Sequence, residues 1–159
     1  MYFDTHCHLN SDDLYENHDM FIQNALDNNV DNMVVVGYDL KSSQIAIELA
    51  KQYEFIYAAV GIGPNDCSNT TKKQIDIIDK YLEEPCVVAL GEIGLDYYWD
   101  NEPHEVQQKW FIRQLELAGE VKKPVIIHSR EAAADTMYIM KNYAQGLGGV
   151  IHCYSYSRE

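Results

Sequence analysis

Short apolar runs alternate with longer amphipathic segments along the whole chain. Runs rich in β-branched residues predict six strands, at residues 2–3, 33–36, 55–60, 86–90, 125–127 and 149–151. Between them lie segments of helical length, at residues 19–29, 42–53, 71–82, 105–122 and 132–144. In the longest of these, apolar residues recur at helical spacing on one face, at Trp110, Phe111, Leu115 and Ala118.

Strands that alternate with helices predict parallel βαβ units and an α/β fold. The nearly continuous apolar strands favour a sheet that is covered on both faces. Two architectures fit this pattern, an open doubly wound sheet and an incomplete (β/α)₈ barrel. A full barrel typically needs about 250 residues, so about six βα units within one domain of residues 1–159 would leave the last strands absent.

Composition narrows the class of protein. With 47% hydrophobic and 23% charged residues, and with no long apolar stretch or secretory signal, we expect a cytoplasmic protein without a membrane segment. The formal net charge of −13 opposes broad attraction to nucleic acid, but it permits a phosphodiester held by metals and a few basic side chains. The scattered cysteines predict reduced, mostly buried thiols.

Five chemistry-bearing side chains follow predicted strands. They are His6 and His8 after the first, Glu92 after the fourth, His128 after the fifth and His152 after the sixth. The carboxyl ends of parallel strands open on one face of the sheet, so these side chains are expected to converge there. Each alone is more often structural, but their shared position predicts metal binding.

Five ligands exceed the three or so that one catalytic zinc ion uses. The surplus predicts two divalent ions (Mg, Mn or Zn) bridged by Glu92. Imidazole ligands suit Zn or Mn, while Mg prefers oxygen. The other two histidines, His18 and His104, fall near predicted helix starts in polar surroundings and are interpreted as surface residues.

Weaker candidates surround this set. Arg130 is two residues beyond His128 and either clamps a phosphate oxygen as a catalytic residue or pairs with an acid such as Glu131. The aromatic residues of segment 97–99 either stack on a base or cap the barrel core, and the second interpretation is slightly preferred. Asp4 is expected to orient a metal ligand.

Several blocks of the sequence resemble the TatD family of hydrolases. FDTHCHL at residues 3–9 resembles the family's opening FxDxHxHL signature, and GEIGLDY at residues 91–97 looks like its next element. QQKWFIRQLELA, KPVIIHSREA and GVIHCYS, at residues 107–118, 123–132 and 149–155, are similar to the blocks that follow. The resemblances run in family order along the chain.

The resemblance implies a (β/α)₈ barrel, incomplete here, with a dinuclear metal site. It implies that His6 and His8 bind one ion, that Glu92 bridges, and that His128 and His152 bind the second. Members are typically deoxyribonucleases, and related members cleave D-aminoacyl-tRNA esters. The implied substrate is therefore DNA, single-stranded or at 3′ ends.

Three departures from the family pattern accompany the resemblance. Gly63 stands where the family's GxHP element has histidine, and Tyr156 stands where HCxSGS has glycine, a position that suggests positive φ. The family's final acidic ligand is expected beyond residue 159.

The prediction is thus a metal-dependent phosphodiester hydrolase. The alternatives are an aminoacyl-ester hydrolase and, in another class, an inactive fragment or partner-binding remnant. No obligate protein partner is evident, although a partner or a swapped dimer would complete the barrel.

Overall fold

The apolar runs and amphipathic segments fold as strands and helices in the predicted order. The computed structural model describes residues 1–99 and 101–157. Its strands are β1 (Tyr2–Cys7), β2 (Val30–Val36), β3 (Ile56–Val60), β4 (Val87–Asp96), β5 (Val125–Arg130) and β6 (Gly149–Ile151). Its helices are α1 (Asp12–Tyr15), α2 (His18–Asp27), α3 (Leu40–Gln52), the 3₁₀ turn η1 (Pro64–Asp66), α4 (Lys72–Leu82), α5 (His104–Val121) and α6 (Ala133–Tyr143).

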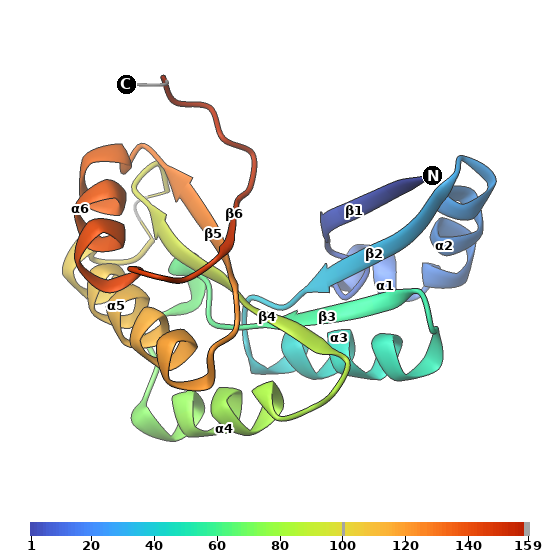
Figure 1. The fold of residues 1–159 in the computed structure, drawn as a ribbon, viewed down its shortest axis with the longest axis horizontal. Helices are drawn as coiled ribbons and strands as arrows, with labels where there is room; N and C mark the ends of the chain where they lie inside the picture. The colour runs from blue at the N-terminus through green and yellow to red at the C-terminus, as the bar shows by residue number, and fades with distance from the viewer. Residues whose placement is uncertain (100, 158–159) are drawn as a thin grey trace.

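The strands form one parallel sheet in which sequence order is also spatial order, β1-β2-β3-β4-β5-β6. The sheet curves, and α2 to α6 lie along its outer side, with β1 and β6 at its two ends (Figure 1). This is a half-barrel of α/β type, so the predicted incomplete barrel of parallel strands is confirmed and the open doubly wound sheet is wrong.

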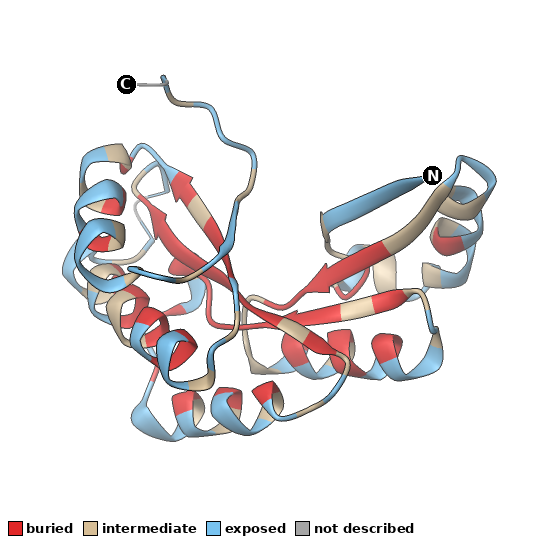
Figure 2. Cartoon of the chain, viewed as in Figure 1, coloured by how far each residue is buried: buried red, intermediate tan, exposed pale blue. Residues whose placement is uncertain are grey.

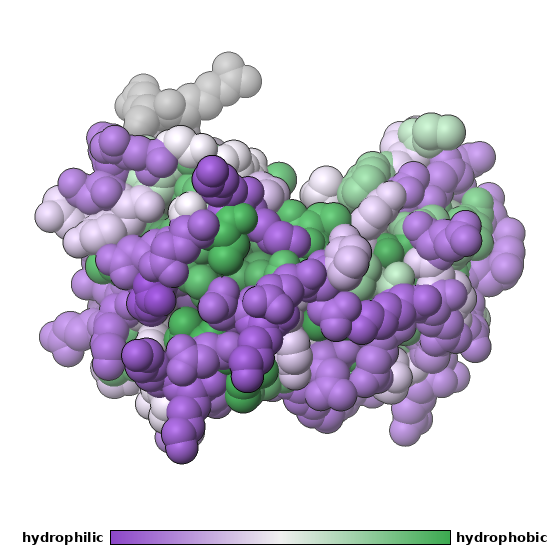
Figure 3. All heavy atoms as spheres, turned by 60° about the horizontal axis from the view of Figure 1, so that its bottom comes forward, coloured by the Kyte–Doolittle hydropathy of each residue, from purple (hydrophilic) through white to green (hydrophobic). Residues whose placement is uncertain are grey.

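Alternate residues of the central strands face two separate apolar clusters. Met33 and Val35 pack into the larger cluster with the helices. Val34 and Val36 belong to a smaller cluster with small or branched residues of the neighbouring strands, Ala59, Ala89 and Ile126. The central strands are therefore buried on both faces, while β1 and β6 are mostly exposed (Figure 2). Hydrophilic residues cover much of the face seen in Figure 3, and apolar ones gather toward its middle.

Three strands extend beyond their predicted carboxyl ends. β1 continues to Cys7, β4 to Asp96 and β5 to Arg130, so His6, Glu92 and His128, which were expected after these strands, lie within them. Polar side chains end the apolar pattern, but backbone pairing continues, as the register of Asp96 with Arg130 shows. The short α1 and η1 were not predicted, because four and three residues carry no periodic signal.

Two buried glutamines of α5 hold the ends of neighbouring strands. Gln107 accepts from the backbone N–H of Asp96 (2.8 Å) and donates to its carbonyl (3.0 Å). Gln114 does the same for Ile62, just beyond β3, at 2.8 and 3.0 Å. Such a paired amide fixes backbone that the sheet ladder no longer satisfies. Of the helices that the structure describes, none has the length and apolar content to cross a membrane.

Candidate metal centre

The five predicted ligands come together at the carboxyl end of the sheet. His6, Glu92 and His128 lie in the carboxyl-terminal halves of β1, β4 and β5, and His8 and His152 lie just beyond β1 and β6. Curvature of the sheet brings its first and last strands to the same place, since the rings of His6 and His152 stack with centroids 3.8 Å apart.

Glu92 lies at the centre of this group, with only 8% of its surface exposed. Its Oε2 is 3.6 Å from His6 Nε2 and 3.4 Å from His8 Nε2. Its Oε1 is 3.0 Å from His128 Nδ1 and 2.9 Å from His152 Nε2. Each carboxylate oxygen therefore faces its own pair of histidines.

The ring nitrogens within each pair are also close together. His6 Nε2 and His8 Nε2 are 3.0 Å apart, and His128 Nδ1 and His152 Nε2 are 2.9 Å apart. Together with Glu92, each pair forms a set of three donor atoms within 4.8 Å of one another. Ligands about 2.0–2.1 Å from a common ion have this spacing, so the nitrogen and oxygen donors of each set suit a divalent metal ion.

In two of the imidazole rings, the hydrogen bond made by one nitrogen determines that the other nitrogen is free to bind an ion. His8 Nδ1 lies 3.0 Å from the carbonyl oxygen of Val36, which only accepts, so Nε2 keeps its lone pair. His128 Nε2 lies 2.9 Å from Asp96 Oδ2, so Nδ1 keeps its lone pair toward Glu92. In the neutral tautomers, both lone pairs point toward the shared carboxylate.

Asp96 belongs to this group of side chains, although the sequence analysis assigned it no role. It is 1% exposed and places one carboxylate oxygen against His128. Its other oxygen accepts the backbone N–H groups of Tyr98 (3.0 Å) and Trp99 (3.4 Å). The available signal was an acid four residues beyond Glu92, and in an extended strand even spacing places both on one face.

The charges of this group perturb one another. Burial alone would raise the pKa of Glu92, but hydrogen bonds from the surrounding histidines, His128 and His152 foremost, hold that pKa far below its usual range. Burial would lower the pKa of His8 and of His128, yet the hydrogen bond to Glu92 and its charge raise both. Glu92 is thus a buried anion that attracts cations.

Gly94, in the middle of the GEIGLDY element, allows β5 to approach β4 at the site. Its φ is +139°, and an added Cβ would lie 2.0 Å from the carbonyl oxygen of His128. Only glycine fits both the backbone conformation and this contact. The glycine therefore sets the distance between the strands that carry Glu92 and His128.

Arg130 makes a different contact from either one that was predicted. Its guanidinium lies 3.7 Å from the centroid of the Tyr98 ring and 5.6 Å from that of Trp99. The same residue lines a pocket of about 300 Å³ together with His128 and His152. The preferred interpretation of the aromatic segment holds for Tyr97, which packs against the core, but not for Tyr98 and Trp99, which are about half exposed.

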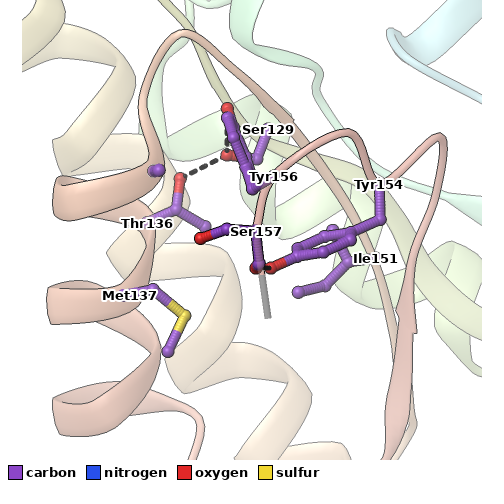
Figure 4. Close-up of a pocket in the computed structure, with 8 residues that line it drawn as sticks. Ser129, Thr136, Met137, Ile151, Tyr154, Tyr156 and Ser157 are labelled. Atoms are coloured by element: carbon purple, nitrogen blue, oxygen red, sulfur yellow. Dashed lines mark hydrogen bonds between the residues drawn. The ribbon is translucent and has the colours of Figure 1, made fainter. Parts of the chain in front are cut away.

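Tyr156 is accommodated without the strain that its family position suggested. Positive φ at non-glycine residues occurs, in the described part of the chain, at Cys153 and three other positions but not at Tyr156. The Tyr156 hydroxyl lies 3.1 Å from Ser129 Oγ (Figure 4). It also accepts the backbone N–H of Ala132 at 3.2 Å. These bonds fasten the segment after β6 to β5 and to the start of α6.

Gly63 is buried at the start of η1, where the family has histidine. Its backbone N–H donates to the Tyr38 carbonyl at 2.7 Å, and an added Cβ would lie 3.3 Å from Tyr38 Cβ. Asp4, expected to orient a metal ligand, accepts the backbone N–H of His6 at 3.0 Å. It therefore positions the backbone of the first ligand and not its imidazole.

The remaining histidines and cysteines lie outside the centre. His104 is exposed and stacks on Tyr97, as expected for a surface residue, whereas His18 is half-buried against Tyr15. All four cysteines are free, but the prediction of mostly buried thiols was wrong. Only Cys67 is fully buried, and Cys153 is exposed because it follows the short edge strand β6.

Four histidines around one buried carboxylate form a donor set suited to divalent metal, at the end of the sheet where parallel α/β barrels carry their active sites. Comparisons with known proteins identify the family. A model described as TatD related DNase matches residues 3–159. The chain therefore belongs to the TatD-related DNase family.

Individual relatives agree with this family. The chain is 40% identical to the uncharacterized metal-dependent hydrolase YabD of Bacillus subtilis, over 100% of the chain and 63% of that protein. It is 32% identical to the 3′-5′ ssDNA/RNA exonuclease TatD of Escherichia coli, over 99% of the chain and 61% of that protein. The chain thus spans somewhat under two thirds of the length of these relatives.

Solved structures support the same fold. The crystal structure of the TatD homologue YJJV from Escherichia coli superposes with a TM-score of 0.92 at 30% identity, over 98% of this chain and 61% of that one. An uncharacterized amidohydrolase from Saccharomyces cerevisiae superposes with a TM-score of 0.81 at 19% identity, over 89% and 51% of the two chains. The second likeness concerns the fold alone.

Proposed function

We propose that this protein is a divalent-metal-dependent hydrolase of phosphodiester bonds, with single-stranded DNA as its substrate class. The observation that carries the proposal is the position of Glu92, whose two carboxylate oxygens each face a separate pair of histidines. The relatives named as ssDNA/RNA exonucleases support the choice of substrate.

In this proposal His6 and His8 hold one ion, His128 and His152 hold the other, and Glu92 bridges them. When bound, two such ions supply an activated water and stabilise charge on the attacking and leaving oxygens. The buried Glu92 carboxylate keeps both donor sets aligned, because its low pKa leaves it ionised throughout the neutral range. The two imidazole nitrogens that face each Glu92 oxygen provide the remaining protein donors.

Arg130 is proposed to hold the substrate. It lines the same pocket as His128 and His152, and its guanidinium carries N–H donors that match phosphate oxygens. The stacking contact with Tyr98 restricts the guanidinium, so less side-chain entropy is lost when a phosphate binds. The local positive charge is needed in a chain whose net charge is −13.

The test is hydrolysis of a 5′-labelled single-stranded oligonucleotide with Mn²⁺ and with EDTA. We expect Mn²⁺-dependent shortening by the wild type, at least 100-fold slower shortening by Glu92→Gln, and normal shortening by Glu116→Gln. Glu116 is the matched control because it is an exposed glutamate of α5 that pairs with Arg113. Equal cleavage by Glu92→Gln, or hydrolysis of a D-aminoacyl ester in place of the oligonucleotide, would contradict the proposal.

A further inference from the structure

Two large aromatic side chains are exposed immediately beyond the strand that carries Glu92. Tyr98 is 53% exposed and Trp99 is 49% exposed, and their rings are 4.8 Å apart at right angles. Exposed aromatic residues that occur singly need no explanation. Here two adjacent aromatic side chains are each about half exposed beside the candidate metal centre.

The pair is held in a defined position by the same residues that shape the centre. Asp96 Oδ1 accepts the backbone N–H groups of Tyr98 and Trp99, and the other oxygen of that carboxylate contacts His128. The backbone N–H of Tyr97 donates to the carbonyl of Arg130 at 2.9 Å. The aromatic segment is therefore fixed to the ends of both β4 and β5.

Arg130 connects the rings to the pocket. Its guanidinium covers the Tyr98 ring at 3.7 Å, a cation–π contact, and its side chain also lines the pocket formed with His128 and His152. A phosphate held by Arg130 would place the adjacent nucleotide against the exposed ring surfaces. Rings that only covered the protein's own core would not need a residue that contacts both them and the pocket.

We infer that Tyr98 and Trp99 form a stacking subsite for an unpaired nucleobase of single-stranded nucleic acid. The inference rests on the proposed function, in which Arg130 holds the neighbouring phosphate. Every base offers a π-face, so stacking tolerates any sequence, whereas bases paired within a duplex are not accessible to the rings. Stacking also supplies affinity that a chain with a net charge of −13 cannot obtain from general electrostatic attraction.

The test compares two labelled strands of equal length and charge, an oligothymidylate and its abasic sugar-phosphate counterpart. Binding is measured by fluorescence anisotropy in EDTA, so that neither strand is cleaved. We expect the wild type to bind the oligothymidylate on the order of ten-fold more tightly than the abasic strand. Trp99→Ala and Tyr98→Ala should each remove most of this preference, while Trp99→Phe should retain much of it.

Tyr138→Ala is the matched control, since Tyr138 is a 68% exposed tyrosine of α6 that does not line the pocket. Salt should weaken binding of both strands alike and leave their ratio unchanged, because the strands carry the same charge. Equal affinity of the wild type for the two strands would overturn the inference, as would an unchanged preference in Trp99→Ala. Stable folding of each variant is checked by its thermal melt.

The outcome separates the two proposals. Cleavage of oligonucleotides by a protein that lacks the base preference would leave the proposed function standing and overturn the stacking subsite. A base preference that depends on Trp99, in a protein that cleaves no phosphodiester with Mn²⁺, would support the subsite and contradict the proposed function.

Discussion

Replacing Asp96 by asparagine tests whether the residue found only in the structure controls the candidate metal centre. The asparagine side chain has the same shape and can still accept the N–H groups of Tyr98 and Trp99 through its oxygen. Its amide group would then face His128 Nε2, which lies 2.9 Å from the carboxylate in the wild type. Two donors would oppose each other, so the His128 proton would move to Nδ1, the nitrogen that faces Glu92.

The size of the effect follows from this geometry. The Asp96 carboxylate is 1% exposed, so water cannot replace its contact with the imidazole. Loss of an outer partner of a ligating histidine typically weakens metal binding about 10- to 100-fold. At about 1.4 kcal/mol for each factor of ten, this corresponds to about 1.4–2.8 kcal/mol.

Isothermal titration with Mn²⁺ measures the change directly. Asp96→Asn should weaken one of two binding events and leave the event at His6 and His8 nearly unchanged. Asp135→Asn serves as the control, because the Asp135 carboxylate accepts the Tyr97 hydroxyl at 2.8 Å and contacts no histidine. Unaltered Mn²⁺ affinity in Asp96→Asn would refute the reasoning that this carboxylate fixes the tautomer of His128.

Three further predictions concern pH, thiol chemistry and the strand contact. The hydrogen bond to Glu92 and the charge of Glu92 raise the pKa of His128. The ion pair between protonated His128 and Glu92 therefore stabilises the metal-free protein fully below the pKa of an unfolded histidine, about 6.5. This stabilisation is lost as pH rises through the raised pKa. Protons compete with metal at the same nitrogen, so the rise in Tm caused by Mn²⁺ should be larger at pH 8 than at pH 6, and a smaller rise at pH 8 would contradict this. Burial raises the pKa of the Cys67 thiol to about 12, whereas Cys153 is exposed. A thiol reagent at pH 8 should therefore label Cys153 fast, and Cys153→Ser should remove the fast labelling. Fast labelling that persists in this variant would contradict the prediction. Gly94→Ala should lower the free energy of unfolding by more than about 2 kcal/mol in urea denaturation, because a Cβ would clash with the His128 carbonyl; a loss below 0.5 kcal/mol would mean that β5 can move away.

The sequence alone determined the order and type of the main elements. Apolar runs such as 33–36 and 125–127 are local signals, and the physics of alternating strands and helices makes the resulting sheet parallel. The same local pattern indicated His6, Glu92 and His128, because polar residues that come soon after an apolar run predict the carboxyl-terminal part of a strand. The resemblance to a family added the choice of a barrel over an open sheet.

Strand ends and the roles of neighbouring polar residues required the tertiary structure. The sequence places Asp96 beyond the predicted strand. In the structure its backbone pairs with β5, and its carboxylate contacts His128, 32 positions further along the chain. Gln107 lies on the buried side of α5, where its amide forms hydrogen bonds with the backbone of Asp96. Such residues are buried only because a partner satisfies them, and the partner is distant in sequence.

The position of Arg130 shows the same limit. From the sequence it had equal reason to pair with an acid or to bind a phosphate, since both need only a nearby negative charge. The register of β4 and β5 instead brings the aromatic segment under its guanidinium, a contact that neither interpretation included. Local patterns determine which residues reach the carboxyl end of the sheet, whereas register and curvature determine which of them touch, because contact depends on the three-dimensional path of strands that the sequence separates.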